Sequence, residues 1–156
     1  MSKAFTKEDD GQAAPEETLP PRSATPQPVT PEGLARLRAE HAELAARAGT
    51  LAPAESRRAK ALARILETVY ALEPSLQNAG AGFGAFVTFE DEDGKVVSYQ
   101  IVGPDEADLA QGRLSVASPI ARALMGRKVG DSVTLRRPKG DVEVTLRDVR
   151  LSPIAP

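Results

Sequence analysis

The sequence predicts an α+β protein in which an antiparallel helical hairpin, a short coiled coil, precedes a small antiparallel β domain with one short helix. Between Thr30 and Gln77 the apolar residues recur at alternating three- and four-residue spacings, as they do along a helical seam. From Phe83 onward they alternate with polar residues in short runs that end at Gly- or Asp-containing turns, which is typical of strands. A run of helices followed by a run of strands favours the α+β class.

Four segments follow from these patterns. We predict a disordered Pro-rich tail over 1–29, the hairpin over 30–78, the β domain over 79–152 and a second tail over 153–156. The first tail is rich in Pro, Thr, Ser and Glu and has almost nothing to bury, as disordered segments do. A short partner-binding motif in this tail is the alternative.

Composition excludes several classes of function. The 156 residues carry a formal net charge of −2, so any contact with nucleic acid needs a local basic patch. The absence of cysteine excludes disulfides, thiolate metal sites and a cysteine nucleophile. Aromatic residues make up only 4% of the chain, which disfavours an aromatic-lined pocket or a base-stacking platform. No apolar run approaches the ~18 residues of a membrane span, and we expect a cytoplasmic protein without membrane contact.

The helical hairpin has clear start and stop signals. Thr30 is a good N-cap, and Pro31 is a good first helical residue. The stretch "GTLAPAES" (49–56) interrupts the helical pattern, and Pro74 ends the second helix because it cannot donate to the helical ladder. The predicted seam consists of Leu34, Leu37, His41, Leu44, Ala48 and Leu51 in the first helix and Leu62, Ile65, Val69 and Leu72 in the second. Because the hairpin satisfies its own seam, we expect a monomer.

Five alternating runs predict the strands of the β domain. Asp93-Gly94 predicts a sharp turn between the first two runs. Val149 is out of phase with Leu146, which predicts a β-bulge near Arg147–Asp148. The five runs are "GAFVTFE" (84–90), "VVSYQIV" (96–102), "RLSVAS" (113–118), "SVTLRR" (132–137) and "VEVTLRDV" (142–149).

A very short helix is predicted over "SPIARALMG" (118–126), between the third and fourth runs. Ser118 can cap it, and Pro119 suits its first position. Ile120 and Leu124 share one face, and Gly126 can supply the left-handed residue that ends the helix. So short a helix is unstable alone, which indicates that its ends are fixed for a purpose.

Catalytic and metal-binding patterns are weak. The acids over 90–93 lack the remaining ligands of a calcium loop and predict a solvated hairpin tip. His41 is the single histidine and lies on the seam, so no zinc site or histidine-based triad can be assembled. There is no phosphate-binding glycine loop. We therefore expect no enzyme, no metal and no cofactor.

One group of basic residues lies at the start of the second helix. Arg57, Arg58, Lys60 and Arg64 occur there, and three of them share one side at helical spacing. A weak RNA or DNA phosphate contact is one interpretation. A solvated helix face is the other, because acids in the same hairpin nearly balance the charge.

The order of these segments, together with three motifs, resembles the Gre (GreA/GreB) family of bacterial transcription elongation factors. The motifs are "YQIVGPDEAD" (99–108), "SPIARALMGRKVGD" (118–131) and "PKGDVEVTLRDV" (138–149). The resemblance covers about residues 82–151 well. It implies a globular domain with an FKBP-like fold that docks on RNA polymerase at the mouth of its secondary channel.

The resemblance also assigns a docking element. In the family, the loop and short helix at the Ser-Pro step contact a coiled coil of the large polymerase subunit. This implies a polymerase-docking role for Ser118, Pro119, Ile120 and Arg122. The family often has an acid just before Ser-Pro, whereas this chain has Ala117.

The family's cleavage element does not carry over. Gre hairpins reach down the channel, and acids at a tip signature like "GDLSENADY" help to hold a magnesium ion and water for cleavage of backtracked RNA. The tip here is "GTLAPAES", with Thr50 at its turn and Glu55 as its one carboxylate. One carboxylate is a poor holder for an octahedral cation. We predict a regulator that binds polymerase without stimulating cleavage. The alternatives are an active elongation or cleavage factor, an adaptor like the nucleoside diphosphate kinase regulators, and, from fold alone, a peptidyl-prolyl isomerase.

Overall fold

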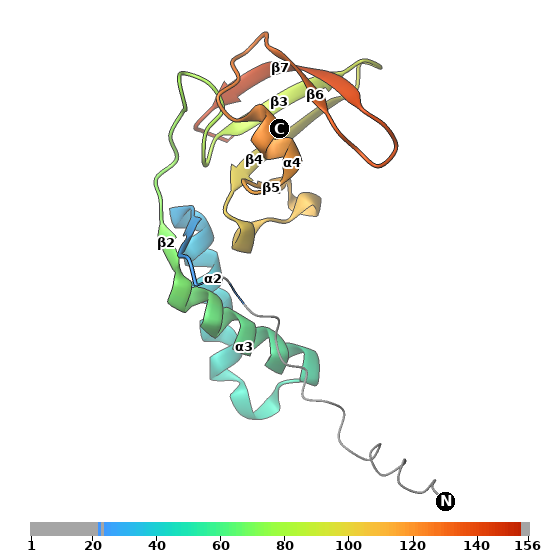
Figure 1. Cartoon of the computed structure of the whole chain (residues 1–156). Coiled ribbons are helices and arrows are strands. Elements are labelled where there is room, and N and C mark those ends of the chain that lie inside the picture. Colours follow the sequence, from blue (N-terminus) through green and yellow to red (C-terminus); the bar gives the residue numbers. More distant parts are fainter. Residues whose placement is uncertain (1–21, 23, 154–156) are drawn as a thin grey trace, which may run out of the picture.

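The computed structural model describes Arg22 and residues 24–153, and this part of the chain forms a helical hairpin below a five-stranded sheet (Figure 1). The hairpin comprises β1 (Gln27–Val29), α2 (Pro31–Ala46), the 3-10 turn η1 (Ala48–Thr50), α3 (Pro53–Thr68) and β2 (Val69–Ala71). The sheet domain comprises β3 (Phe86–Asp91), β4 (Val96–Val102), η2 (Pro104–Glu106), η3 (Leu109–Gln111), β5 (Arg113–Ser115), α4 (Pro119–Leu124), β6 (Ser132–Leu135) and β7 (Val142–Arg150). The α+β class is thus as predicted.

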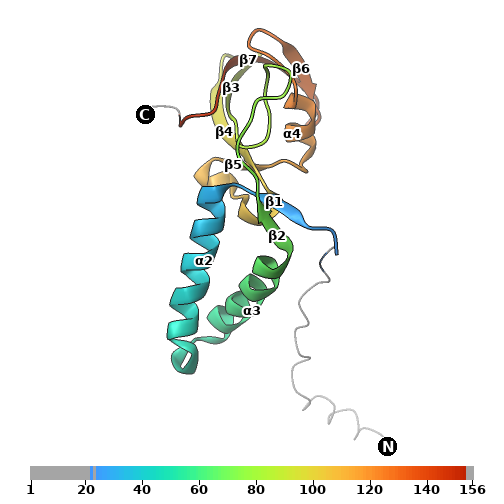
Figure 2. The ribbon, with the colours of Figure 1, turned by 90° about the vertical axis from the view of Figure 1, so that its left-hand side faces the viewer.

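Helices α2 and α3 lie against each other along much of the predicted seam (Figure 2). The buried apolar residues of this interface are Leu37, Leu44, Leu62 and Ile65, and Leu34 and Leu51 pack against them. Leu62 has no exposed surface at all. The first helix ends at Ala46, so Ala48 belongs to the exposed turn η1 and not to the seam.

The second helix ends earlier than the sequence predicts. It stops at Thr68, and Val69–Ala71 forms strand β2, which pairs in parallel with β1. The pairing continues at Leu72, whose N–H donates to the carbonyl of Val29 at 2.9 Å. β-branched and aromatic residues such as Val69 and Tyr70 suit a strand once a partner strand is present. The prediction of Val69 and Leu72 as helical seam residues is therefore wrong.

Strand β1 lies inside the segment that the sequence predicts as a disordered tail. Gln27–Val29 pairs with β2, and Val29 is fully buried in the hairpin core. The sequence signal is poor because Pro28 interrupts so short a run, and its pairing partner is about forty residues away along the chain. The prediction for residues 1–21 lies outside the described residues.

The sheet has the strand order β5-β4-β3-β7-β6 and curls around its own core (Figure 2). The predicted alternation is confirmed: Val87, Phe89, Val144 and Leu146 are buried on the inner face. The bulge is confirmed too. Thr88 pairs with Asp148 and Phe89 with Leu146, so one extra residue of β7 lies between the two pairs. Helix α4 packs beside β6 and buries Ala121 and Leu124 in the same core.

The sequence predicts a wholly antiparallel sheet, and this prediction is wrong at one edge. Strand β5 pairs in parallel with β4 at the edge of the sheet. The connection over 103–112 folds into the turns η2 and η3, which bring the chain back alongside residues 100–102 of β4. Parallel pairing needs such a crossover, and no local alternation of residues reveals it.

A buried carboxylate joins the two modules. Glu106, in η2, has 2% of its side chain exposed. It accepts hydrogen bonds from the Thr30 N–H at 2.6 Å and from the Thr30 hydroxyl at 2.7 Å. That hydroxyl also accepts from the Gly33 N–H at 3.0 Å, so the predicted N-cap of α2 is confirmed. The carboxylate thus lies at the positive end of the α2 dipole, where negative charge is favoured.

The close approach of the modules requires glycine at two positions. A Cβ on Gly33 would overlap the Glu106 carboxylate, and a Cβ on Gly103 would overlap the carbonyl of Pro28. A second contact lies beside them. The Arg22 guanidinium binds both carboxylate oxygens of Asp105, at 2.6 and 2.8 Å, and donates to the Thr68 hydroxyl. We call Arg22, Thr30, Thr68, Asp105 and Glu106 the junction cluster.

Candidate docking surface and hairpin tip

Helix α4 is held rigidly at both ends despite its six residues. The Ser118 hydroxyl donates to the carbonyl of Ser115 at 2.7 Å and accepts from the Ala121 N–H at 3.2 Å. At the other end, Gly126 has a φ of +79° and donates its N–H to the carbonyl of Ala81 at 2.7 Å. The capping predicted from the sequence is confirmed, and the helix is a fixed feature of the surface.

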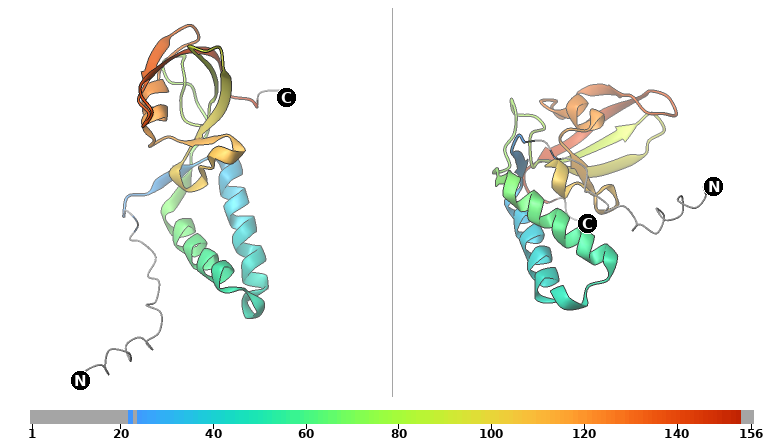
Figure 3. Two further views of the ribbon diagram at one scale, coloured as in Figure 1. Left: turned by 90° about the vertical axis from the view of Figure 1, so that its right-hand side faces the viewer. Right: turned by 60° about the horizontal axis from the view of Figure 1, so that its bottom comes forward.

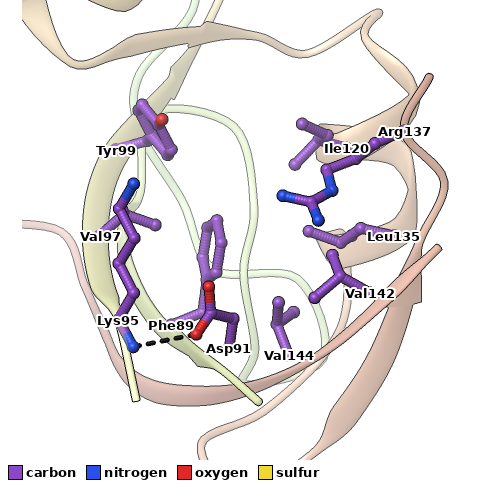
Figure 4. A pocket seen from close by; sticks show the side chains of 10 residues that line it. All are labelled: Phe89, Asp91, Lys95, Val97, Tyr99, Ile120, Leu135, Arg137, Val142 and Val144. Atoms are coloured by element: carbon purple, nitrogen blue, oxygen red, sulfur yellow. Dashed lines mark hydrogen bonds between the residues drawn. The ribbon is translucent and has the colours of Figure 1, made fainter. Parts of the chain in front are cut away.

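The structure brings the four predicted docking residues together on α4. Pro119 and Arg122 are exposed, whereas Ser118 is half-buried because it serves as the cap. Ile120 is also half-buried and lines a pocket between α4 and the sheet (Figure 4). The group therefore presents one rigid polar and apolar surface beside a hollow.

This pocket has a volume of about 160 Å³. Its lining residues are Phe89, Asp91, Lys95, Val97, Tyr99, Ile120, Leu135, Arg137, Val142 and Val144. The rings of Phe89 and Tyr99 lie 6.0 Å apart, and Arg137 reaches in from the side of β6 (Figure 4). Small-molecule sites usually measure about 300–1,000 Å³, so this pocket suits a single side chain of a protein partner better than a metabolite.

The basic residues of α3 do not form one free surface. Arg58 turns toward α2 and binds Glu40 with two hydrogen bonds of 2.7 and 2.8 Å. The Arg58 guanidinium lowers the pKa of the Glu40 carboxyl. Arg57 and Lys60 are exposed and Arg64 is half-buried. One of the four cations predicted for a phosphate contact is therefore already neutralised by a carboxylate across the hairpin.

The single carboxylate at the hairpin tip is also engaged. Glu55 accepts from the Ala52 N–H at 3.0 Å, which caps α3, and from the Arg47 guanidinium at 3.0 Å. These two contacts, the Ala52 N–H first, lower the pKa of the Glu55 carboxyl. Thr50 is exposed and donates its hydroxyl to the carbonyl of Arg47. The tip is thus a self-satisfied turn in which the carboxylate stabilises the helix start.

Other carboxylates in the described part of the chain do not gather into a metal site. In the β3–β4 turn, Asp91 accepts from the N–H groups of Asp93 and Lys95, and Glu90 binds Arg147 at 2.8 Å. These acids organise a hairpin turn. Neither long helix of the described residues combines the length and hydropathy needed to cross a bilayer.

Sequence reasoning missed several residues that shape these sites. The junction cluster is invisible because Thr30 and Glu106 lie far apart in the chain. Arg137 was not singled out, although the run "RRPKG" (136–140) is a visible concentration of charge. Attention to that run would have pointed to the mouth of the pocket.

Comparison with known proteins places these features in context. The family model "Transcription elongation factor, GreA/GreB, C-term" matches residues 76–151. GreB of Pseudomonas aeruginosa is 39% identical, with 78% of this chain and 89% of that protein covered. GreA of Rhodospirillum rubrum is 38% identical, with 76% and 95% covered. GreA of Alkalilimnicola ehrlichii is 50% identical, but the match spans only 57% of its length. The Gfh1 structure of Thermus thermophilus is 26% identical, with 80% of this chain and 99% of that chain covered, and its TM-score of 0.42 is too low to add to the sequence comparison.

Proposed function

The chain belongs to the GreA/GreB family of transcription elongation factors, and we propose that it binds bacterial RNA polymerase through α4 without stimulating transcript cleavage. The observation that carries the first part is the doubly capped α4, which presents Pro119 and Arg122 next to an apolar pocket. A rigid helix beside a hollow of one side chain's size suits docking onto another protein, because little conformational entropy is lost on binding.

The partner surface we propose is the coiled coil of the large polymerase subunit near the secondary channel. The sheet domain would then have the FKBP-like role of a docking platform and not an isomerase role. Its pocket supports this, because only Phe89 and Tyr99 of the aromatic residues line it. We further propose that the protein acts as a cytoplasmic monomer and is not itself an enzyme.

The hairpin tip supports the second part of the proposal. A magnesium ion needs several oxygen ligands in near-octahedral geometry. Glu55 is the one carboxylate of the tip stretch 49–56, and its oxygens already accept from Ala52 and Arg47. To ligate a cation, it would have to abandon the helix cap. The protein therefore occupies its site on polymerase and competes with cleavage-competent factors.

The test is transcript cleavage by backtracked bacterial RNA polymerase. We expect no cleavage with this protein alone, and inhibition when it is added against a cleavage-competent Gre factor. Replacing Arg122 by Glu should raise the concentration needed for inhibition by at least tenfold, whereas Lys60→Glu, an equal charge change on exposed α3, should leave it within twofold.

Two results would overturn parts of the proposal separately. Cleavage with the protein alone would refute the account of the tip, and Glu55→Gln would then show whether that carboxylate acts. Absence of inhibition, or equal effects of the two charge variants, would refute docking through α4.

A further inference from the structure

A concentrated basic surface lies around strand β6. Over residues 122–139 the chain carries six cations and one acid, a net charge of +5 in a protein whose total is −2. The acid, Asp131, accepts a backbone hydrogen bond from the Lys128 N–H at 2.9 Å. The six cations, all exposed, are Arg122, Arg127, Lys128, Arg136, Arg137 and Lys139. We call them the β6 basic surface.

No ion pair joins any of these six cations to a carboxylate among the described residues. Most arginines elsewhere in the described residues do form such ion pairs, namely Arg22, Arg36, Arg47, Arg58, Arg113, Arg147 and Arg150. Six cations without a carboxylate partner are thus concentrated around β6. An unpaired guanidinium can bind an external anion without first losing an internal partner, so the β6 basic surface is ready for a polyanion.

Their placement follows the edge of the sheet. Strand β6 is one of the two edge strands of the sheet, and α4 packs beside it (Figure 3). Arg127 and Lys128 precede the strand, Arg136 and Lys139 follow it, and Arg122 projects from α4. A four-residue strand separates the two groups by roughly 10 Å at about 3.3 Å per residue. Four successive phosphates of one duplex strand, spaced about 3.4 Å apart along the helix axis, span that length.

We propose that the β6 basic surface binds the phosphate backbone of nucleic acid without reading its sequence. Arginines predominate, and guanidinium groups match phosphate geometry through paired hydrogen bonds. The surface itself has no aromatic residue on which a base could stack. Binding therefore depends on contacts with phosphates and not on the identity of the bases, and it weakens steeply with salt. Under this proposal the main phosphate contact lies on the sheet domain and not on α3.

Fluorescence anisotropy of the full chain with a labelled 20-nucleotide RNA and a labelled 20-base-pair DNA tests this directly. With about three phosphate contacts, duplex affinity should fall roughly 40-fold between 50 and 200 mM KCl. The triple variant R127Q/R136Q/K139Q avoids the proposed polymerase-docking residues. It should bind at least tenfold more weakly at 50 mM KCl and show a shallower salt dependence.

A matched triple variant, R38Q/R57Q/K60Q, removes three exposed cations from the hairpin and should bind within twofold of the unaltered protein. Circular dichroism and the cleavage-competition assay confirm that both variants fold and still dock. Three outcomes overturn the proposal: equal losses in both triple variants, no binding at 50 mM KCl, or competition by polyglutamate as effective as by unlabelled RNA. The last would assign the surface to an acidic protein.

Discussion

Removing the Glu106 carboxylate should separate the hairpin from the sheet domain. Glu106→Ala deletes two short, charge-assisted hydrogen bonds from Thr30, at 2.6 and 2.7 Å, and two longer ones of 3.3 Å, from the Arg36 guanidinium and the Gly103 N–H. Each hydrogen bond to a charged group contributes about 1.5–3 kcal/mol. Solvent does not weaken these bonds in the folded protein, because only 2% of the Glu106 side chain is exposed. Water admitted to the junction recovers part of this. We expect a loss of about 4 kcal/mol.

Thermal and urea unfolding measure this loss. At roughly 3 °C per kcal/mol for a chain of this size, the Tm should fall by about 12 °C. Helix content at 222 nm follows the hairpin, and tyrosine fluorescence follows the sheet domain when both proteins carry Tyr70→Phe, which leaves Tyr99 as the one tyrosine. In the unaltered protein both signals should change together, whereas in Glu106→Ala the helix signal should be lost first.

The control is Glu67→Ala, which removes an exposed carboxylate from α3 and should cost under about 0.5 kcal/mol. Glu106→Gln keeps the shape but turns an amide N–H toward a donor of Thr30, so it should lie nearer to Ala than to the unaltered protein. A loss below about 1 kcal/mol, or coincident transitions in Glu106→Ala, would show that the modules are joined by other contacts.

Three further predictions concern the hairpin and α4. Lowering the pH from about 5 to 3 should weaken the α2–α3 pairing: Arg58 holds the pKa of Glu40 below its ordinary value, so stability present above that value is lost as Glu40 protonates. Urea midpoints across this range should fall less in Glu40→Gln. Leu62→Ala leaves a cavity at a fully buried position and should lower the free energy of unfolding, measured with urea, by about 2–5 kcal/mol. A decrease below about 1 kcal/mol would contradict the packing of Leu62 between α2 and α3. Ser118→Ala should lower stability by about 1 kcal/mol and weaken polymerase competition, while unchanged competition would show that the cap is not needed for docking.

Local patterns were enough to predict most elements. Thr30 and Ser118 predict helix starts because an N-cap depends only on the next three residues. The bulge in β7 is predictable because Val149 breaks the two-residue alternation of the strand. The Gre resemblance led to the proposal that α4 docks on polymerase. It did not reveal how the pocket beside it is lined.

Features that depend on distant partners were missed for a common reason. Strands β1 and β2 are three residues each, too short for a period, and β5 is parallel only because of the crossover before it. Glu106 is one of three carboxylates in the stretch "PDEAD" (104–108), whose composition predicts no more than a charged loop. Nothing local distinguishes a solvated acid from one buried against a helix end 76 residues away.

The parallel pair β1–β2 brings the two ends of the helical hairpin together, and we call this pair the neck of the hairpin. The chain enters through Val29 and leaves through Ala71, and these residues face each other across the pair. Everything between them can be exchanged as a cassette without rerouting the sheet domain, provided that Thr30 and Gly33 remain to receive Glu106. If the proposed function is right, grafting a longer arm with an acidic tip onto the neck should confer cleavage stimulation on this protein. Shortening the arm of a cleavage-competent relative at the same place should remove it.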